Sequence, residues 1–188
     1  IYLYFRKAVL KRFIITLSLI FLFFINLGES MAVEQENLIY LELKDGQVII
    51  ETRPDLAPNH VARIKELVAE GFYDGIVFHR VIDGFMAQTG DPKGDGTGGS
   101  DKPDLKSEFS NANHGRGAVS MARAQNPDSA NSQFFICFGD ASFLDGEYTI
   151  WGQVIEGMEY IDKIKRGEGP NGSVSNPDKI IKMHLAKK

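Results

Sequence analysis

The sequence contains one cysteine among its 188 residues, and this scarcity limits the covalent chemistry of the protein. Cys137 has no second cysteine to pair with, so internal disulfides are excluded. An oxidising compartment is therefore permitted but not indicated. The residue lies in the apolar run 134–138, where we expect it to be buried as a small apolar side chain.

The spacing typical of metal ligands is also lacking. The four histidines lie far apart in the sequence, at His60, His79, His114 and His184. Three aspartates, Asp91, Asp95 and Asp101, are spaced like those of a calcium loop, but the glutamate that completes such a loop is missing. We therefore expect these aspartates to be solvated turn residues, and we expect neither a metal nor a cofactor.

A basic surface is missing as well. The formal net charge is −4 at pH 7, and the basic residues of the globular part do not gather in a patch. The glycine-rich run GDGTGG at 94–99 has neither the Gly-Lys-Ser/Thr of a phosphate-binding loop nor the glycine spacing of a dinucleotide-binding loop. Nucleic acid is therefore not expected as a partner.

No apolar run reaches the length of a typical membrane-spanning helix. The longest, from Phe13 to Leu27, has 15 residues interrupted by three polar ones, whereas a spanning helix needs about 20. Four basic residues precede it and the small residues of Ser30-Met31-Ala32 follow it, which predicts a cleaved signal peptide at 1–32 and a mature domain at 33–188. Cleavage leaves 17 basic and 24 acidic residues, a net charge of −7, and no membrane contact. An uncleaved anchor and a cytoplasmic start at Met31 are the alternatives.

The remaining chain is dominated by short strands. Apolar residues alternate with polar ones on both sides of Asp45-Gly46, which predicts a hairpin. Pro58 and Gly71 bound a segment with helical spacing, and a second helix is expected over 157–166. Further strands are predicted at 76–78, 117–122, 133–138, 148–154 and 180–185. Because strands and helices do not alternate, the pattern favours an all-β barrel or sandwich.

The stretch FHRVIDGFMAQTGD, residues 78–91, brings together groups that can bind and polarise a substrate. Arg80 is a permanently charged planar donor, Phe85 and Met86 can form an apolar floor, and Gln88 can donate and accept hydrogen bonds. No nucleophile stands beside a base, so covalent catalysis is not indicated. Taken alone, Arg80 would more often be a surface ion-pair partner, since most arginines are exposed. His79 points to the opposite strand face and is expected to form structural hydrogen bonds.

Four blocks in this order resemble the cyclophilin-type peptidyl-prolyl cis-trans isomerases, in the bacterial, periplasmic branch. They are FHRVIDGFMAQTGD, SMARA at 120–124, SQFFI at 132–136 and FLDG at 143–146, and the resemblance covers about Leu38 to Met183. It implies a closed eight-stranded antiparallel β-barrel capped by two α-helices, with a peptide groove on the outer face. It also implies a monomer without cofactors that acts on proline-containing polypeptides, here unfolded or nascent exported proteins in the periplasm.

The resemblance also implies roles for individual residues. Arg80 would be catalytic, donating to the prolyl nitrogen, with Gln88 beside it. The implied substrate-binding residues are Phe85, Met86, Gly96, Ala122, Arg123, Ala124, Gln133, Phe135, Phe143, Leu144 and Tyr148. Phe143 stands where tryptophan is common in the best-known eukaryotic pattern, and Tyr148 where histidine is common. The missing indole puts strong cyclosporin binding in doubt.

Two other functions are alternatives to an isomerase. A module that only holds proline-containing segments would need the pocket but not Arg80, so the retention of that arginine favours an enzyme. A secreted hydrolase lacks support, because Ser120, Ser129 and Ser132 are not in a nucleophile-elbow pattern. Gln133 alone would be read as an ordinary strand amide.

Overall fold

The computed structural model describes residues 35–186, and the signal peptide predicted for residues 1–32 lies outside this range. Residues 37–186 belong to one compact unit. None of the helices in the described part is both long and apolar enough to cross a bilayer. The strands are β1 (Leu38–Leu43), β2 (Gly46–Thr52), β3 (Arg80–Ile82), β4 (Met86–Thr89), β5 (Ala118–Met121), β6 (Phe134–Cys137), β7 (Ile150–Glu156) and β8 (Lys182–Leu185), and the helices are α2 (Pro58–Ala69), α3 (Met158–Ile161) and the 3-10 turn η1 (Ser142–Leu144).

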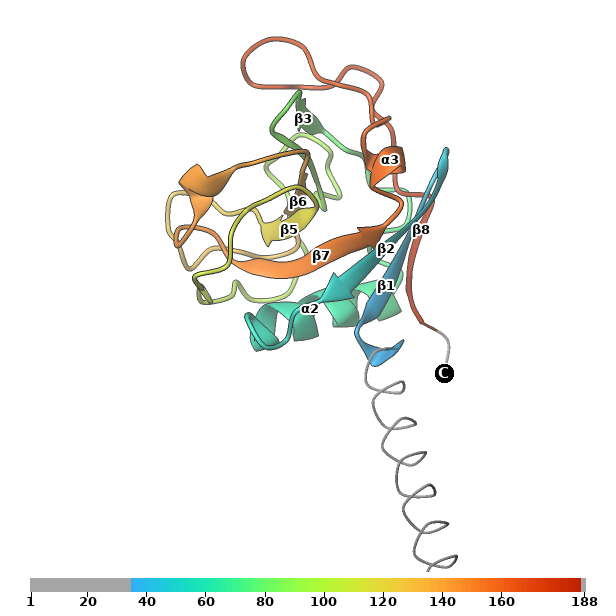
Figure 1. Ribbon diagram of the computed structural model, residues 1–188. Coiled ribbons are helices and arrows are strands. Elements are labelled where there is room, and N and C mark those ends of the chain that lie inside the picture. The colour runs from blue at the N-terminus through green and yellow to red at the C-terminus, as the bar shows by residue number, and fades with distance from the viewer. Residues whose placement is uncertain (1–34, 187–188) are drawn as a thin grey trace, which may run out of the picture. The chain divides into compact units, whose positions relative to one another are not determined.

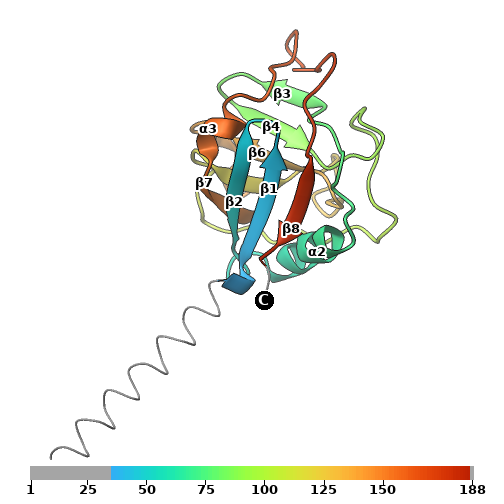
Figure 2. The ribbon, with the colours of Figure 1, turned by 90° about the vertical axis from the view of Figure 1, so that its right-hand side faces the viewer.

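The eight strands form a single curled sheet in the order β3-β4-β6-β5-β7-β2-β1-β8 (Figures 1 and 2). Every neighbouring pair is antiparallel. Helix α2 packs against β7 and β8 near one end of the sheet, and α3 packs against β2 near the β1–β2 turn (Figure 1). The expected strand number, direction and helix pair are therefore present.

The expected closure of the barrel is not shown, because the edge strands β3 and β8 do not pair with each other. The segments that precede them meet at one isolated bridge, Val77–Lys179. Around this bridge the Phe78 N–H donates to the Asp178 carbonyl and the Ile180 N–H to the Ile76 carbonyl, both at 2.9 Å.

Side chains fill the interior of the curled sheet. Alternate residues of β1 and β2 point inward, as the hairpin pattern predicted, and Ile39, Leu41 and Ile50 are fully buried. Trp151 and Phe134 meet edge to face with ring centroids 5.4 Å apart. Because this core leaves no room for a peptide, a binding site must lie on the outside of the sheet.

Three local predictions were wrong. The strand expected at 76–78 contributes only the bridge at Val77, and β4 was not foreseen as a strand. The second helix ends at Ile161 instead of Arg166. Beyond Ile161 the backbone bonds become i→i+3, with Lys163 N–H donating to the Tyr160 carbonyl (3.2 Å) and Ile164 N–H to the Ile161 carbonyl (3.1 Å).

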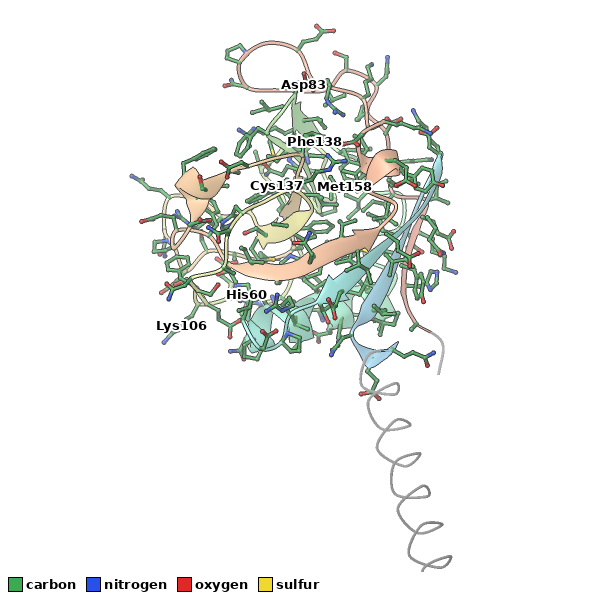
Figure 3. All side chains as sticks on the ribbon, in the orientation of Figure 1. His60, Asp83, Lys106, Cys137, Phe138 and Met158 are labelled. Atoms are coloured by element: carbon green, nitrogen blue, oxygen red, sulfur yellow. The ribbon has the colours of Figure 1, made fainter. Side chains whose placement is uncertain are left out.

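Cys137 is buried, as expected, and lies among packed side chains near the centre, whereas Lys106 lies at the periphery (Figure 3). Burial, reinforced by the charge of Asp145, raises the pKa of the Cys137 thiol to about 12. The thiolate is therefore scarcely populated at neutral pH, and the residue acts as core filling rather than as a nucleophile.

Candidate active site

Two adjoining hollows lie on the outer face of the sheet, and together their linings contain every site residue predicted from the sequence. The first hollow has a volume of about 290 Å³ and is lined by Arg80, Phe85, Met86, Gln88, Ala122, Arg123, Phe135, Phe143, Leu144 and Tyr148. The second, of about 390 Å³, is lined by Gln88, Gly96, Thr97, Gly98, Gly99, Ser100, Asp104, Ala122, Arg123, Ala124, Ser129, Asn131 and Gln133. Gln88, Ala122 and Arg123 border both hollows.

The floor of the first hollow is a small apolar cluster separate from the main core. Antiparallel pairing of β4 with β6 places Met86 opposite Cys137 and Gln88 opposite Phe135. Their strand neighbours Ala87, Thr89, Phe134 and Ile136 are completely buried. The pleat therefore sends one set of residues to the core and presents the other set to the hollow.

Aromatic rings complete the walls of the first hollow. Phe135 is 4% exposed, and the Tyr148 ring meets it edge-on with centroids 5.9 Å apart. Phe85 and Phe143 form a second pair, with centroids 5.2 Å apart. Phe143 is 69% exposed, so it forms a rim while Phe135 forms the base. The result is a mainly aromatic surface of a size that suits a small apolar ring.

A chain of hydrogen bonds orients Arg80 at the edge of this surface. Arg80 on β3 stands opposite Gln88 on β4, and its Nη1 donates to Gln88 Oε1 at 3.0 Å. Gln88 Nε2 donates to Gln133 Oε1 at 2.9 Å. Gln133 Nε2 in turn donates to the carbonyl oxygens of Gly96 (3.0 Å) and Gly98 (2.8 Å). Both glutamines are thereby fixed, and Gln133 is more than an ordinary strand amide.

A partner of Arg80 that sequence reasoning missed is the main-chain carbonyl of Asn171, which accepts from Arg80 Nε at 3.1 Å. The sequence gives no indication of this hydrogen bond, because its acceptor is a main-chain carbonyl 91 positions away, which any residue type could supply. Within residues 35–186, no carboxylate forms an ion pair with Arg80. The guanidinium is thus positioned by neutral groups and keeps its full charge for a ligand.

The segment Ala122-Arg123-Ala124 crosses between the two hollows. Two of its N–H groups are already used inside the protein, since Ala122 donates to the Gln133 carbonyl (2.9 Å) and Ala124 donates to Ser129 Oγ (2.9 Å). Within the described chain, the Arg123 N–H and the Ala122 carbonyl remain for a bound peptide. These two groups could pair with an extended segment.

The glycine-rich loop is built around Asp91, which was expected to be solvated but is 1% exposed. Its carboxylate accepts hydrogen bonds from the N–H groups of Lys93 (2.8 Å), Asp95 (3.1 Å) and Gly96 (2.6 Å). Burial pushes the pKa of Asp91 upward, but these donors outweigh burial and leave the pKa below its usual range. Asp91 is therefore a structural anion, and no cluster of metal-ligating side chains occurs in the described residues.

The expected hydrogen-bonding role of His79 was wrong. The residue is 7% exposed, and neither ring nitrogen reaches hydrogen-bonding geometry with a described residue. Burial lowers the pKa of His79, so the ring is neutral at physiological pH. It packs under the glycine-rich loop, where a Cβ on Gly96 would lie 3.7 Å from the ring.

A Ser–His–Asp arrangement does occur, but it cannot act as a hydrolase site. His114 Nε2 lies 3.0 Å from Ser120 Oγ, and His114 Nδ1 lies 2.9 Å from Asp145 Oδ1. Both Ser120 and His114 are completely buried, and Ser120 donates to the Thr149 carbonyl at 3.0 Å. Because no substrate can reach the hydroxyl, this group is a structural tie between strands and loop.

Comparison with known proteins gives a consistent result. The model of the family described as cyclophilin type peptidyl-prolyl cis-trans isomerase/CLD matches residues 38–185. A probable peptidyl-prolyl cis-trans isomerase of Brucella abortus is 60% identical over 168 residues, which cover 83% of this chain and 86% of that protein. Peptidyl-prolyl cis-trans isomerase B of Bacillus subtilis is 42% identical over 131 residues, covering 69% of this chain and 91% of that protein.

Solved structures show the same fold. Cyclophilin AquaCyp293 of Hirschia baltica is 29% identical with a TM-score of 0.72, covering 80% of this chain and 74% of that one. A cyclophilin type peptidyl-prolyl cis-trans isomerase of Cryptosporidium parvum, crystallised in the presence of the dipeptide Ala-Pro, is 26% identical with a TM-score of 0.72. That match covers 80% of this chain and 99% of the other.

Proposed function

Since this chain belongs to the family of cyclophilin-type peptidyl-prolyl cis-trans isomerases, we propose that Arg80 and the first hollow together carry its catalytic step. The proline ring of a substrate occupies the hollow against Phe135, and Arg80 donates a hydrogen bond to the prolyl nitrogen. The observation that carries this proposal is the guanidinium without a carboxylate partner at the edge of an apolar surface. No covalent intermediate is formed.

The physical problem is the rotation of an amide bond. Resonance gives rotation about this bond a barrier of about 18–20 kcal/mol. Without a catalyst, cis-trans isomerisation of X–Pro bonds therefore takes tens to hundreds of seconds. In the planar amide the nitrogen lone pair is delocalised into the carbonyl group. As the bond twists, that lone pair becomes a hydrogen-bond acceptor, so a donor aimed at it binds the twisted state more tightly than the planar one.

The two glutamines and the Asn171 carbonyl fix the orientation of the Arg80 guanidinium before the substrate binds. Two of the guanidinium nitrogens, Nε and Nη1, are engaged by Asn171 and Gln88. The remaining nitrogen, Nη2, is left for the substrate. Little reorganisation is then needed when the amide twists, which is the condition under which a charged donor is most effective. The apolar hollow excludes water that would otherwise stabilise the planar amide.

This mechanism predicts turnover that does not change between about pH 7 and pH 9. Arginine stays charged throughout this range, and burial lowers the pKa of the neighbouring His79, which therefore stays neutral. Protease-coupled turnover of an Ala-Pro peptide across this range is the measurement. A rate that rises or falls tenfold with one apparent pKa would instead indicate proton transfer by His79 or another titrating group.

Below about pH 7, protonation of His79 changes the free energy of unfolding in one direction only, toward lower stability. A histidine whose pKa is lowered on folding favours the folded state above its unfolded value of about 6.5, and this contribution is lost as the pH falls through the folded pKa. Any fall in activity toward acid should therefore follow unfolding, as circular dichroism on the same samples would show.

We further propose that the protein is exported and acts as a monomer on unfolded or nascent proteins of the periplasm, without nucleic acid or membrane contact. The proposal is supported by the basic start and the apolar run that precede the domain. The mature chain is expected to begin at about Val33. N-terminal sequencing of native protein from separated cell fractions tests this, and a cytosolic protein that begins at Met31 or Ala32 would contradict it.

Cyclosporin is expected to bind weakly, because Phe143 at the rim of the first hollow offers no N–H donor. Phe143→Trp would supply one, and a net hydrogen-bond contribution of about 0.5–1.5 kcal/mol corresponds to roughly two- to tenfold tighter binding. Calorimetric titration of both proteins is the test. Tight binding by the natural protein with no gain in the variant would show that the rim donor is unimportant.

A further inference from the structure

The first hollow carries positive charge in a protein that is acidic overall. Its lining contains two arginines, Arg80 and Arg123, and no aspartate or glutamate. The whole chain has a formal net charge of −4 at pH 7. The binding site is therefore electrostatically opposite to the average of the molecule, which is a condition for selecting charged ligands.

Arg123 is held firmly in its position. Its Nη1 donates to the Ala124 carbonyl (3.1 Å) and its Nη2 to the Glu147 carbonyl (3.1 Å), while its Cζ lies 4.6 Å from the centroid of the Tyr148 ring. The side chain is 15% exposed. These contacts fix the guanidinium but do not neutralise it, because main-chain carbonyls and an aromatic ring carry no net charge.

The nearest carboxylate competes only weakly for this charge. Glu147 Oε2 lies 3.7 Å from Arg123 Nη2, and the Glu147 side chain is 70% exposed. An exposed pair of this kind contributes little, because water and salt screen it and holding two long side chains in one geometry costs entropy. A second carboxylate delivered by a bound peptide could therefore share or replace it.

A bound substrate would bring one particular side chain close to the surface that carries the two arginines. With the proline ring in the hollow, the preceding residue is joined to the prolyl nitrogen, the atom that Arg80 faces in the proposed mechanism. The Cα atoms of the two residues lie at most about 3.8 Å apart. Arg80 on β3 and Arg123 both line this hollow, so the side chain of the preceding residue begins beside a surface that carries both guanidinium groups.

We propose that this isomerase prefers substrates with a glutamate or aspartate immediately before the proline, and that Arg123 is the residue that determines this preference. The proposal rests on the function proposed for the first hollow. The guanidinium of Arg123 is fixed before the substrate arrives, so only the side chain of the substrate has to be ordered when the contact forms. Because the contact lies near the surface, we expect its effect to be about two- to fivefold in kcat/KM at low salt.

The test compares tetrapeptides Ala-X-Pro-Phe in which X is glutamate, glutamine or lysine, using exchange NMR or protease-coupled turnover. Glutamate and glutamine have nearly the same shape, so their ratio of kcat/KM isolates charge. We expect glutamate to exceed glutamine, and glutamine to exceed lysine. The glutamate-to-glutamine ratio should fall toward one as NaCl rises from about 20 mM to about 500 mM.

Substitutions at Arg123 test whether this residue causes the preference for an acidic residue before proline. Arg123→Gln should bring the glutamate-to-glutamine ratio close to one, whereas Arg123→Lys, which keeps the charge, should retain much of it. A loss of structure alone would affect both variants alike. Arg116→Gln is the matched control, because it removes the same charge from a side chain that is 50% exposed, pairs with Asp162 and lies outside both hollows. This control should keep the natural ratio.

The outcomes separate this inference from the function on which it rests. Absence of turnover with the glutamine peptide would count against the function of the hollow itself. Turnover with equal rates for glutamate and glutamine at low salt would overturn the preference while leaving the function intact. A ratio that survives in a folded Arg123→Gln protein would show that another charge is responsible. Should that variant not fold, the salt titration of the natural protein still decides whether charge is selected.

Discussion

Arg80→Ala is expected to lower kcat by roughly 10²–10³-fold while leaving the fold and most of the peptide affinity in place. The apolar surface formed by Met86, Phe135 and Leu144 does not depend on the arginine, and burial of a proline ring needs no charge. The hydrogen bond to the prolyl nitrogen exists only when the amide is twisted. An interaction confined to the transition state lowers kcat when it is removed and changes KM little.

The control for this prediction is Arg80→Lys, which should recover little activity. An ammonium group cannot donate to Gln88, to Asn171 and to the substrate in the planar geometry that the guanidinium provides. Circular dichroism and thermal unfolding on the same samples show whether the variants fold. Turnover within threefold of the natural protein in a folded Arg80→Ala variant would mean that the dry surface alone carries catalysis.

Phe135→Ala is expected to have the second large effect, on both stability and substrate binding. The ring is 4% exposed and forms the base of the first hollow, so its removal should cost about 3–5 kcal/mol of unfolding free energy. The substrate also loses the surface against which the proline ring is buried. A loss of about 1–2 kcal/mol of apolar contact would raise KM roughly ten-fold.

The chain offers a matched control in the adjacent residue. Phe134 lies on the opposite face of β6, is completely buried in the main core and does not line either hollow. Phe134→Ala should therefore cost similar stability without raising KM in the folded fraction. Should both alanine variants unfold, the leucine variants at the same two positions make the comparison at lower cost. Equal KM values for the two positions would contradict the assignment of Phe135 to the substrate surface.

The sequence allowed much of the fold to be predicted where periodicity is unambiguous. The β1–β2 hairpin follows from strict alternation around Asp45-Gly46, and α2 follows from an apolar stripe bounded by Pro58 and Gly71. The short end of α3 could not be predicted, because the apolar spacing continues to Ile164 while the backbone hydrogen bonds change to i→i+3 after Ile161. The open edge between β3 and β8 likewise depends on where two distant segments meet.

The candidate site could be predicted only in part. Apolar and amide residues within 78–91 indicated a binding surface, and the family resemblance extended it to Phe135, Leu144 and Tyr148. Residues of the second hollow such as Asn131 and Asp104 carry no motif, since they are assembled from loops that meet only in the folded chain. The Asn171 carbonyl was missed for the same reason. The prediction for His79 was wrong because a strand pattern indicates which face of the sheet a side chain occupies. It does not indicate whether a hydrogen-bond partner is present on that face.

The central claim is that Arg80 stabilises the twisted amide rather than the bound ground state. Exchange NMR of an Ala-Pro peptide on the natural protein and on Arg80→Ala measures the interconversion rate of the bound peptide directly, and titration of the same samples gives Kd. The account predicts an on-enzyme rate lower by roughly 10²–10³-fold in the variant, with Kd changed less than about threefold. A nearly unchanged on-enzyme rate accompanied by a large rise in Kd would contradict it, because Arg80 would then be a residue that binds the substrate without accelerating its rotation.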